Sequence, residues 1–565
     1  MNDIRRTILW VIFGFSMVLL WDKWQLHNGH QATFFPTTPK VQAPAASAPA
    51  SASVPVTSAA VPATSAPATL PGAVTPAGTA AAPATPRERI TVTTDLLRLV
   101  FDTEGGSLVR TEFLKHADLN DKSATFVLLD DSPARVYVAQ TGLIGGSFPT
   151  HKTAMAFSGE RTLKDGANEL VVKFESPDLG GVKLVKTYTI KRGAYDMAVR
   201  HEVLNTGTAP VSPQLYLQLV RDGNKPAGES SFYSTFTGPA AYTEAKKFQK
   251  VEFSDIEKNK AEWEKSSTNG YVAMVQHYFA SAWILPDGLK RDLFMRKVDN
   301  NLYSTGMITP LDSIAPGASK AVDATLFAGP QEEKKLEKLA PGLELVKDYG
   351  WLTILAKPLY WLLEKVHSLV GNWGWAIVGL VVLLKIAFYW LNAKAYASMA
   401  KMKAINPRIM DMRERLKDNP QQMQQEMMRI YREEKVNPMG GCFPIMIQIP
   451  VFIALYWVLL SSVEMRNAPW VAWIHDLSAP DPYFVLPIVM TLTTLLQTAL
   501  NPAPPDPLQA KLMWFMPLAF SIMFFFFPSG LVLYWITNNV LSIAQQWVIN
   551  TRMGVPPQFN LPKFS

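Results

Sequence analysis

The run GLVVLLKIAFYW at residues 379–390 places one lysine, Lys385, inside an otherwise apolar segment. A lysine at the centre of a membrane span costs about 2.5–3.5 kcal/mol on insertion, so it is expected to face a polar cavity or the protein interior. A second interpretation stays open, because Lys385 lies only nine residues before Lys394. Its long side chain could extend along the helix to a membrane interface, as lysines near span ends often do.

Outward from this run, the C-terminal part of the chain contains further apolar segments. A helix needs about 20 apolar residues to cross a bilayer, and these segments approach that length. An N-terminal run, Thr7–Trp24, follows Arg5 and Arg6 and is expected to be an uncleaved anchor, because no small-residue cleavage site follows it. Together they predict six spans, the five C-terminal ones being Asn372–Leu391, Phe443–Val463, Tyr483–Leu500, Leu512–Phe527 and Gly530–Ile549.

Several of these predicted spans carry amide side chains, among them Gln448, Gln497 and Asn539. Single amides in membrane helices usually form hydrogen bonds between helices. Together with Lys385 they could instead line a water-filled recess, and the spacing alone does not decide between the two interpretations.

Charge is distributed very unevenly along the 565 residues, of which 18% are charged and 48% hydrophobic. This charged share is below the roughly 25% of soluble domains, which argues against a wholly soluble or mainly disordered chain. Residues 41–86 carry no charge and consist almost entirely of Ala, Pro, Ser, Thr, Val and Gly. Such a composition predicts a semi-rigid tether without a packed core.

Residues 87–335 have the alternation and turn signals of an antiparallel β-sandwich, for example in Thr91–Thr93, Val182–Ile190 and Met197–Leu204. The segment 343–370 repeats leucines at helical spacing but contains several charges. It therefore predicts an amphipathic helix in the membrane interface, although a helix packed on the soluble domain remains an alternative.

The segment 393–440 is rich in Lys and Arg and predicts two helices, broken near Asp418-Asn419-Pro420 and ending near Pro438. Methionine side chains are flexible and adapt to varied apolar partners, so this hairpin is a candidate receiving surface. Packing of the two helices against each other explains the methionines equally well. The candidates are Met399, Met402, Met410, Met423 and Met427.

Basic loops are expected on the cytoplasmic side of a membrane. This rule places both termini and the 393–440 hairpin in the cytoplasm and the β domain outside it. No GxSxG, HExxH or Walker A pattern occurs, and the single cysteine, Cys442, cannot form an internal disulfide. No enzymatic activity, cofactor or metal site is therefore expected.

Several long runs resemble the YidC family of membrane protein insertases in its Gram-negative form, which has a large periplasmic domain. These runs are AMVQHYFASAWILP (273–286), GNWGWAI (371–377), AYASMAKMKAINPRI (395–409), EKVNPMGGCFPIMIQIPVFIALY (434–456), WIHDLSAPDPY (473–483) and FPSGLVLYWITNN (527–539). The resemblance implies a multi-domain membrane protein of six transmembrane α-helices, namely an anchor and a five-helix insertase core. It also implies a periplasmic antiparallel β-supersandwich and a cytoplasmic helical hairpin.

The expected divisions of the chain combine the residue patterns with this resemblance. They are an anchor (1–24), a tether (25–86), the β domain (87–335), an interfacial helix (343–370), a second span (371–392), the hairpin (393–440), spans three to six (441–549) and a cytoplasmic tail (550–565).

The family resemblance also implies a function in the bacterial inner membrane. A hydrophilic groove open to cytoplasm and lipid would receive the polar segments of nascent membrane proteins. Lys385 stands where the family usually has arginine, and Gln497 and Trp535 fall where family members line the groove; Gln448 and Asn539 are added as further candidates. The implied partners are nascent membrane proteins, the Sec translocon, the ribosome, the signal recognition particle receptor and membrane lipids, without a specific nucleic-acid sequence. The rival interpretation is a secondary transporter or channel that binds an anionic solute at Lys385.

Overall fold

The computed structural model describes residues 87–118, 121–226, 235–416, 419–434, 443–501, 507–554 and 559. The chain divides into two compact units, one of residues 1–276 and 280–329 and the other of residues 277–279 and 330–565. The expected anchor, the expected tether and Cys442 lie outside the described residues.

The first unit contains two antiparallel sheets. In the first sheet the strand order is β1-β2-β3-β6-β11-β18-β17-β14, with β4 paired to β3 and β5 to β6. Its strands are β1 (Arg89–Thr93), β2 (Leu97–Asp102), β3 (Ser107–Ala117), β4 (Thr125–Val127), β5 (Asp130–Ser132), β6 (Arg135–Ile144), β11 (Gln214–Asp222), β14 (Ser266–Ser267), β17 (Arg291–Asp299) and β18 (Leu302–Pro310).

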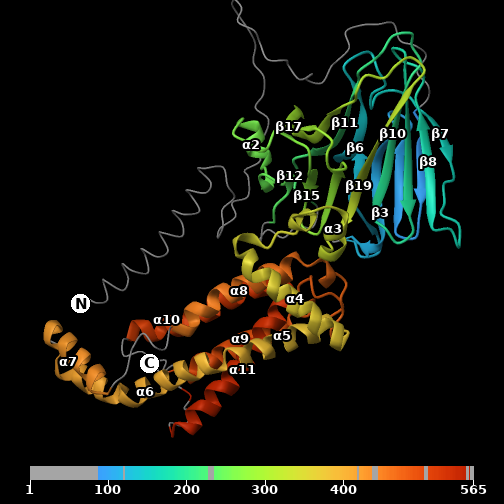
Figure 1. Ribbon diagram of the computed structural model, residues 1–565. Helices are drawn as coiled ribbons and strands as arrows, with labels where there is room; N and C mark the ends of the chain where they lie inside the picture. Colours follow the sequence, from blue (N-terminus) through green and yellow to red (C-terminus); the bar gives the residue numbers. More distant parts are fainter. Residues whose placement is uncertain are drawn as a thin grey trace, which may run out of the picture. The chain divides into compact units, whose positions relative to one another are not determined.

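The second sheet has the order β13-β12-β15-β16-β19-β10-β9-β8-β7, and a short helix, α2 (Phe253–Glu257), follows β13. Its strands are β7 (Ala156–Gly159), β8 (Glu169–Glu175), β9 (Val182–Lys191), β10 (Asp196–Asn205), β12 (Gly238–Thr243), β13 (Lys247–Lys250), β15 (Tyr271–Val275), β16 (Phe279–Ile284) and β19 (Ser319–Pro330). Figure 1 shows strands of both sheets standing side by side in this unit.

The strands that alternation predicted are confirmed. β9 buries Val182, Leu184, Lys186, Tyr188 and Ile190 and leaves the single residues that alternate with them partly exposed, which is the pattern of a strand with one face on a core. β10 covers the second predicted strand, and β1 contains Thr91–Thr93. The turn between β2 and β3 contains Gly105 at a positive φ of 72°, and a Cβ there would lie 2.3 Å from the carbonyl oxygen of His151.

The second unit is helical. Its elements are α3 (Glu333–Leu339), η1 (Leu343–Val346), η2 (Gly350–Leu352), α4 (Thr353–Val370), α5 (Trp373–Ala387), α6 (Tyr389–Arg415), α7 (Pro420–Glu433), α8 (Phe443–Ser461), η3 (Val463–Met465), α9 (Val485–Leu500), α10 (Pro507–Met523), η4 (Phe524–Phe526) and α11 (Ser529–Arg552). In Figure 1, α6 extends away from α9 and α11 and leads to α7.

Some helix boundaries differ from the expected ones. The span expected to run to Leu391 is interrupted, because α5 ends at Ala387 and α6 begins at Tyr389. The helix expected over 343–370 begins only at Thr353, because two 3₁₀ turns and Gly350, at a φ of 66°, precede it. Of the described helices, none is by itself long and apolar enough to cross a membrane, whereas Trp373–Ala387 and Tyr389–Met402 together are, with a bend of 68° between them.

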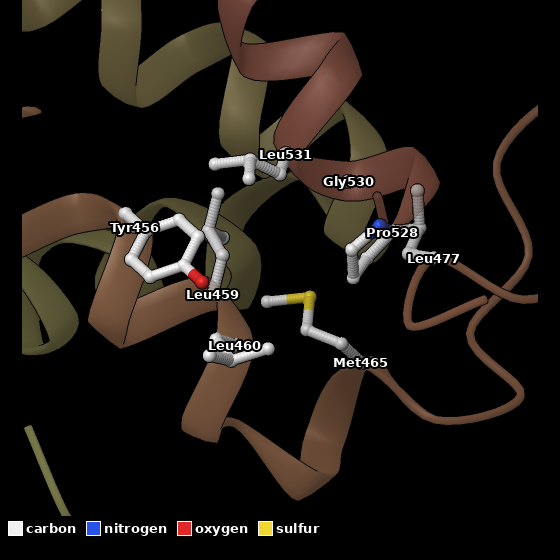
Figure 2. A pocket seen from close by; sticks show the side chains of 8 residues that line it. All are labelled: Tyr456, Leu459, Leu460, Met465, Leu477, Pro528, Gly530 and Leu531. Atoms are coloured by element: carbon white, nitrogen blue, oxygen red, sulfur yellow. The ribbon is translucent and has the colours of Figure 1, made fainter. Parts of the chain in front are cut away.

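The core of the helical unit is formed by one large apolar cluster from α4, α5, α8, α9, α11 and the segment after α8. Its packing is close where α8 turns towards α9. Figure 2 shows the side chain of Met465 reaching between Leu459 and Pro528, and the space left there is only about 10 Å³. This volume is close to the minimum for one water molecule, so the apolar packing at this point is nearly complete.

Candidate functional site

The helical unit contains a cavity of about 320 Å³ with polar side chains in its wall. All five groove candidates named from the sequence line this cavity, although they come from four different helices. They share it with Asn392, Asn538, Tyr534 and a set of apolar residues. The candidates are Lys385 on α5, Gln448 on α8, Gln497 on α9, and Trp535 and Asn539 on α11.

Lys385 is buried, with 7% of its surface exposed. Its ammonium nitrogen donates a hydrogen bond to the Ser542 hydroxyl oxygen at 2.7 Å. Its backbone carbonyl oxygen accepts a hydrogen bond from the Gln545 side chain at 3.3 Å. The side chain therefore contacts α11, and it occupies the polar environment that the insertion cost of a lysine requires.

A chain of amides connects this region to two further helices. The Gln448 side-chain nitrogen donates to the Asn392 side-chain oxygen at 2.9 Å. The Asn392 side-chain nitrogen donates in turn to the Gln545 side-chain oxygen at 3.3 Å. Because Gln545 also bonds to Lys385, the network joins α8, α6, α11 and α5 around the break between α5 and α6.

The opposite wall is formed by an amide and an aromatic group. The Asn539 side-chain nitrogen donates to the Thr494 hydroxyl oxygen at 2.9 Å, which fixes α11 against α9. The Trp535 ring meets the Phe452 ring edge to face, with centroids 4.6 Å apart. Gln497 lines the cavity without a hydrogen bond from its side chain to another described residue.

The described wall of the cavity contains one ammonium group and no carboxylate. This ammonium group donates its hydrogen bond to a neutral hydroxyl group, that of Ser542. A polar segment, and an acidic one above all, can gain hydrogen bonds and charge attraction here that hydrocarbon does not offer. Among the described residues, no group of three or more histidine, cysteine or carboxylate side chains is arranged to hold a metal ion.

Sequence reasoning missed Ser542 and Asn392. A signal for Ser542 was present, since Trp535, Asn539, Ser542 and Gln546 recur at spacings of three and four and so share one face of α11. Asn392 stands at the end of an apolar run, where a polar residue is unremarkable. Its role depends on the break before α6, which hydropathy does not indicate.

The methionine candidates divide into two groups. Met402, Met423 and Met427 pack against a small apolar core formed by Ile405, Ile409, Met412 and Ile430 between α6 and α7. Met410 is exposed over 51% of its surface, and Met399 is half-buried. Helix packing thus accounts for three of the five, and Met410 is the candidate most accessible to a partner.

Comparison with known proteins gives matches over nearly the whole chain. Residues 89–362 match the family described as YidC periplasmic domain, and residues 365–555 match that described as 60Kd inner membrane protein. The chain is 57% identical over 564 residues to a protein of Cupriavidus taiwanensis named membrane protein insertase YidC, covering 98% of each chain. A protein of the same name from Ralstonia nicotianae is 54% identical over 560 residues, again covering 98% of each.

Among solved structures, the chain resembles one described as an active YidC insertase with its first transmembrane domain resolved. The identity is 19% and the TM-score 0.38, over 82% of this chain and 92% of the other.

Proposed function

Because this chain belongs to the YidC family of membrane protein insertases, we propose that the cavity beside Lys385 is the site that receives the polar segments of its client proteins. The chain is an insertase of the inner membrane with a periplasmic domain, and its role is not enzymatic. Membership of an insertase family leaves no support for an anion transporter or channel.

The observation that carries the proposal is the buried ammonium group of Lys385 in a wall whose described residues include no carboxylate. A polar stretch crossing the full hydrocarbon thickness would leave its backbone and side chains unsatisfied, at several kcal/mol per group. The cavity shortens that path, because polar groups can bind water, amides and the lysine inside it. The client's apolar helix then partitions into lipid, gaining about 0.3–0.6 kcal/mol for each strongly apolar residue near its centre.

The proposed topology has six spans, with both termini in the cytoplasm and the β domain in the periplasm. The distribution of Lys and Arg supports it, since ten lie in the 393–440 hairpin. In this arrangement the bent pair α5 and α6 leaves the membrane on the cytoplasmic side and leads directly into the hairpin.

The hairpin is the proposed first contact for the client. Exposed Met410 supports this role, because methionine adapts to apolar segments of different shape. Basic side chains such as Arg413 are suited to anionic lipid, to the ribosome or to a targeting receptor. The Sec translocon is a further proposed partner.

Substitution of Lys385 tests the groove proposal. We expect Lys385→Arg to insert clients normally in reconstituted vesicles, whereas Lys385→Ala and Lys385→Glu insert them more slowly. The loss should be largest for clients whose translocated segment is acidic, because those segments interact with the positive charge. Equal rates for all four proteins with both acidic and neutral clients would contradict the proposal.

A further inference from the structure

The bend between α5 and α6 is not explained by the residues that surround it in the sequence. The two helices meet at Phe388 with a bend of 68° between them. Sharp kinks in helices are usually caused by proline or glycine, or by a side chain that inserts into the ladder of backbone hydrogen bonds. Residues 380–406 contain no proline and no glycine. This leaves a side chain from another helix as the candidate cause.

A side chain of α11 bonds to the backbone at this point. In an uninterrupted helix, the carbonyl oxygen of Lys385 would accept a hydrogen bond from the backbone N–H of Tyr389, four residues later. Here α5 ends before Tyr389, and the Gln545 side-chain nitrogen donates to that carbonyl oxygen at 3.3 Å. The last carbonyl groups of a helix need such partners from outside the helix. Gln545 therefore caps the C-terminal end of α5.

The same amide also holds the first turn of α6. Its side-chain oxygen accepts a hydrogen bond from the Asn392 side-chain nitrogen at 3.3 Å. Gln545 thus bonds to both sides of the break, and this requires a donor and an acceptor on one side chain. A glutamine amide supplies both without carrying a charge.

A chain of hydrogen bonds fixes the orientation of these amides. Gln448 on α8 donates to the side-chain oxygen of Asn392 at 2.9 Å, so the Asn392 nitrogen is directed towards Gln545. The Gln545 oxygen is thereby occupied, and its nitrogen is directed towards the Lys385 carbonyl oxygen. Each amide accepts one bond and donates the next, and the members of such a chain strengthen one another. Asn392, in the middle of the chain, is 3% exposed, so water has little access to it.

We propose that Gln545 is a positioning residue for client transfer, because its amide sets the angle at which α6 and the hairpin leave the cavity. This inference rests on the proposed function, in which the hairpin and the cavity act on the same client. The described wall of the cavity does not include Gln545, whereas it includes Lys385, Asn392 and Gln448, to which Gln545 is linked. A change in the bend therefore alters the cavity wall and the direction of the hairpin together.

The next residue of α11 provides a matched control. Gln546 is also a glutamine, and its side-chain nitrogen donates at 3.3 Å to the Leu500 carbonyl oxygen and to the Asn501 side-chain oxygen, at the end of α9. Gln545→Met and Gln546→Met therefore remove the same group from the same helix. Only the first removes the hydrogen bonds at the break.

The distance between two spin labels measures the bend without any client. In a Cys442→Ser background, Leu383→Cys on α5 and Ala404→Cys on α6 place exposed labels on the two sides of the break. Pulsed electron paramagnetic resonance in nanodiscs should give the same distance distribution for the parent and for Gln546→Met. Gln545→Met should give a broader or shifted distribution, and so should Gln545→Asn, whose shorter side chain does not span both partners. Unchanged distributions in both Gln545 variants overturn the proposal.

Insertion by the full-length chain in reconstituted vesicles measures the consequence for the client. We expect Gln545→Met to insert clients several-fold more slowly than the parent, and Gln546→Met to insert them at the parent's rate. The loss should be equal for acidic and neutral clients, because the bend affects the path of both. An equal loss in Gln546→Met, or an altered bend with undiminished insertion, overturns the positioning role. Failure of the groove proposal would instead appear as normal insertion by Lys385→Ala and Lys385→Glu, with the effect of Gln545→Met on the bend retained.

Discussion

At the residue scale, the sequence identified Lys385 because a charged side chain is unfavourable in hydrocarbon. This can be recognised without knowing which residues contact the lysine. It did not identify Ser542, which lies 157 residues away and contacts Lys385 only because α11 is rotated to face α5. A rotation of this kind follows from side-chain packing along both helices. Local hydropathy contains no information about it.

The Lys385–Ser542 contact predicts coupling between the two side chains. Ser542→Ala should lower the unfolding free energy by about 1.5–3 kcal/mol, since a hydrogen bond to a charged group is lost in a buried place. In Lys385→Met the same serine substitution should cost much less. Thermal unfolding in detergent of the two single variants and the double variant measures this, and additive losses would show that the contact is not stabilising.

A second lysine, Lys186, predicts a pH dependence of the β domain. It is fully buried and donates to the carbonyl oxygens of Gly105 and Thr141, at 2.6 and 2.7 Å. Burial lowers its pKa from 10.5 to about 7. The unfolded chain therefore binds more protons between these pH values, and the unfolding free energy contributed by this group rises from pH 7 to 10.5 and is constant below 7.

Lys186→Met should lose this contribution. Denaturant unfolding at several pH values between about 7 and 10 gives the slope of the unfolding free energy against pH for the wild type and for Lys186→Met. The other titrating groups affect both slopes equally, so the difference between the slopes reports Lys186. Parallel curves for the two proteins would contradict a lowered pKa of Lys186 in the folded state.

At the element scale, prediction succeeded where one face of an element is buried and failed where the chain changes direction within the unit. β9 and β10 were identified from alternation because one side of each strand is buried. The break between α5 and α6 at Phe388 was not identified, because the residues on both sides of it are apolar. The hydrogen bonds of Asn392 near this break are made to residues distant in the sequence, such as Gln545. The late start of α4 has the same cause, because residues 343–352 are held by contacts distant in sequence.

One such contact is the ion pair between the buried ammonium group of Lys347 and the half-buried carboxylate of Glu464, with a nitrogen–oxygen distance of 3.2 Å. Tyr360 on α4 donates to the same carboxylate at 2.7 Å. Lys347→Met leaves the Glu464 carboxylate, which is 19% exposed, without its cationic partner, so it should lower the unfolding free energy by about 1.5–3 kcal/mol, the range for a lost hydrogen bond to a charged group. The double variant with Glu464→Gln should recover part of the loss, and equal stability of the wild type and Lys347→Met would show that the pair does not hold this segment.

The methionines of the hairpin give a prediction that distinguishes binding of a client from packing of α6 against α7. Met410→Ser should weaken crosslinking of a nascent client to the hairpin while leaving the stability of α6 and α7 unchanged, because Met410 is exposed. Met412→Ser is the control, since Met412 is buried between the two helices and its substitution should reduce their stability. Undiminished client crosslinking in a folded Met410→Ser protein would argue against a receiving role at this position.

At the scale of the whole molecule, the sequence predicted an antiparallel β region followed by a helical region, and both are present. The distribution of charge and the periodicity of apolar residues sufficed for this prediction, because the side chains of each region suit the surroundings to which that region is exposed. The assembly of the cavity from five helices could not be predicted from the spacing of polar residues in the sequence. That spacing is equally consistent with amides that form hydrogen bonds between helices and with amides that line a recess. Only the resemblance to a known family brought Lys385, Gln497 and Trp535 into one expected site.

Photocrosslinking of a stalled nascent membrane protein tests the central claim most directly. Probes at positions 385, 497 and 535 lie in the cavity wall, and a probe at Phe520 on the exposed apolar surface of α10 is the control. We predict that the client's polar segment crosslinks to the three cavity positions and not to position 520. Crosslinks of that segment at position 520 alone, with none at the three cavity positions, would contradict the assignment of this cavity as the client's path.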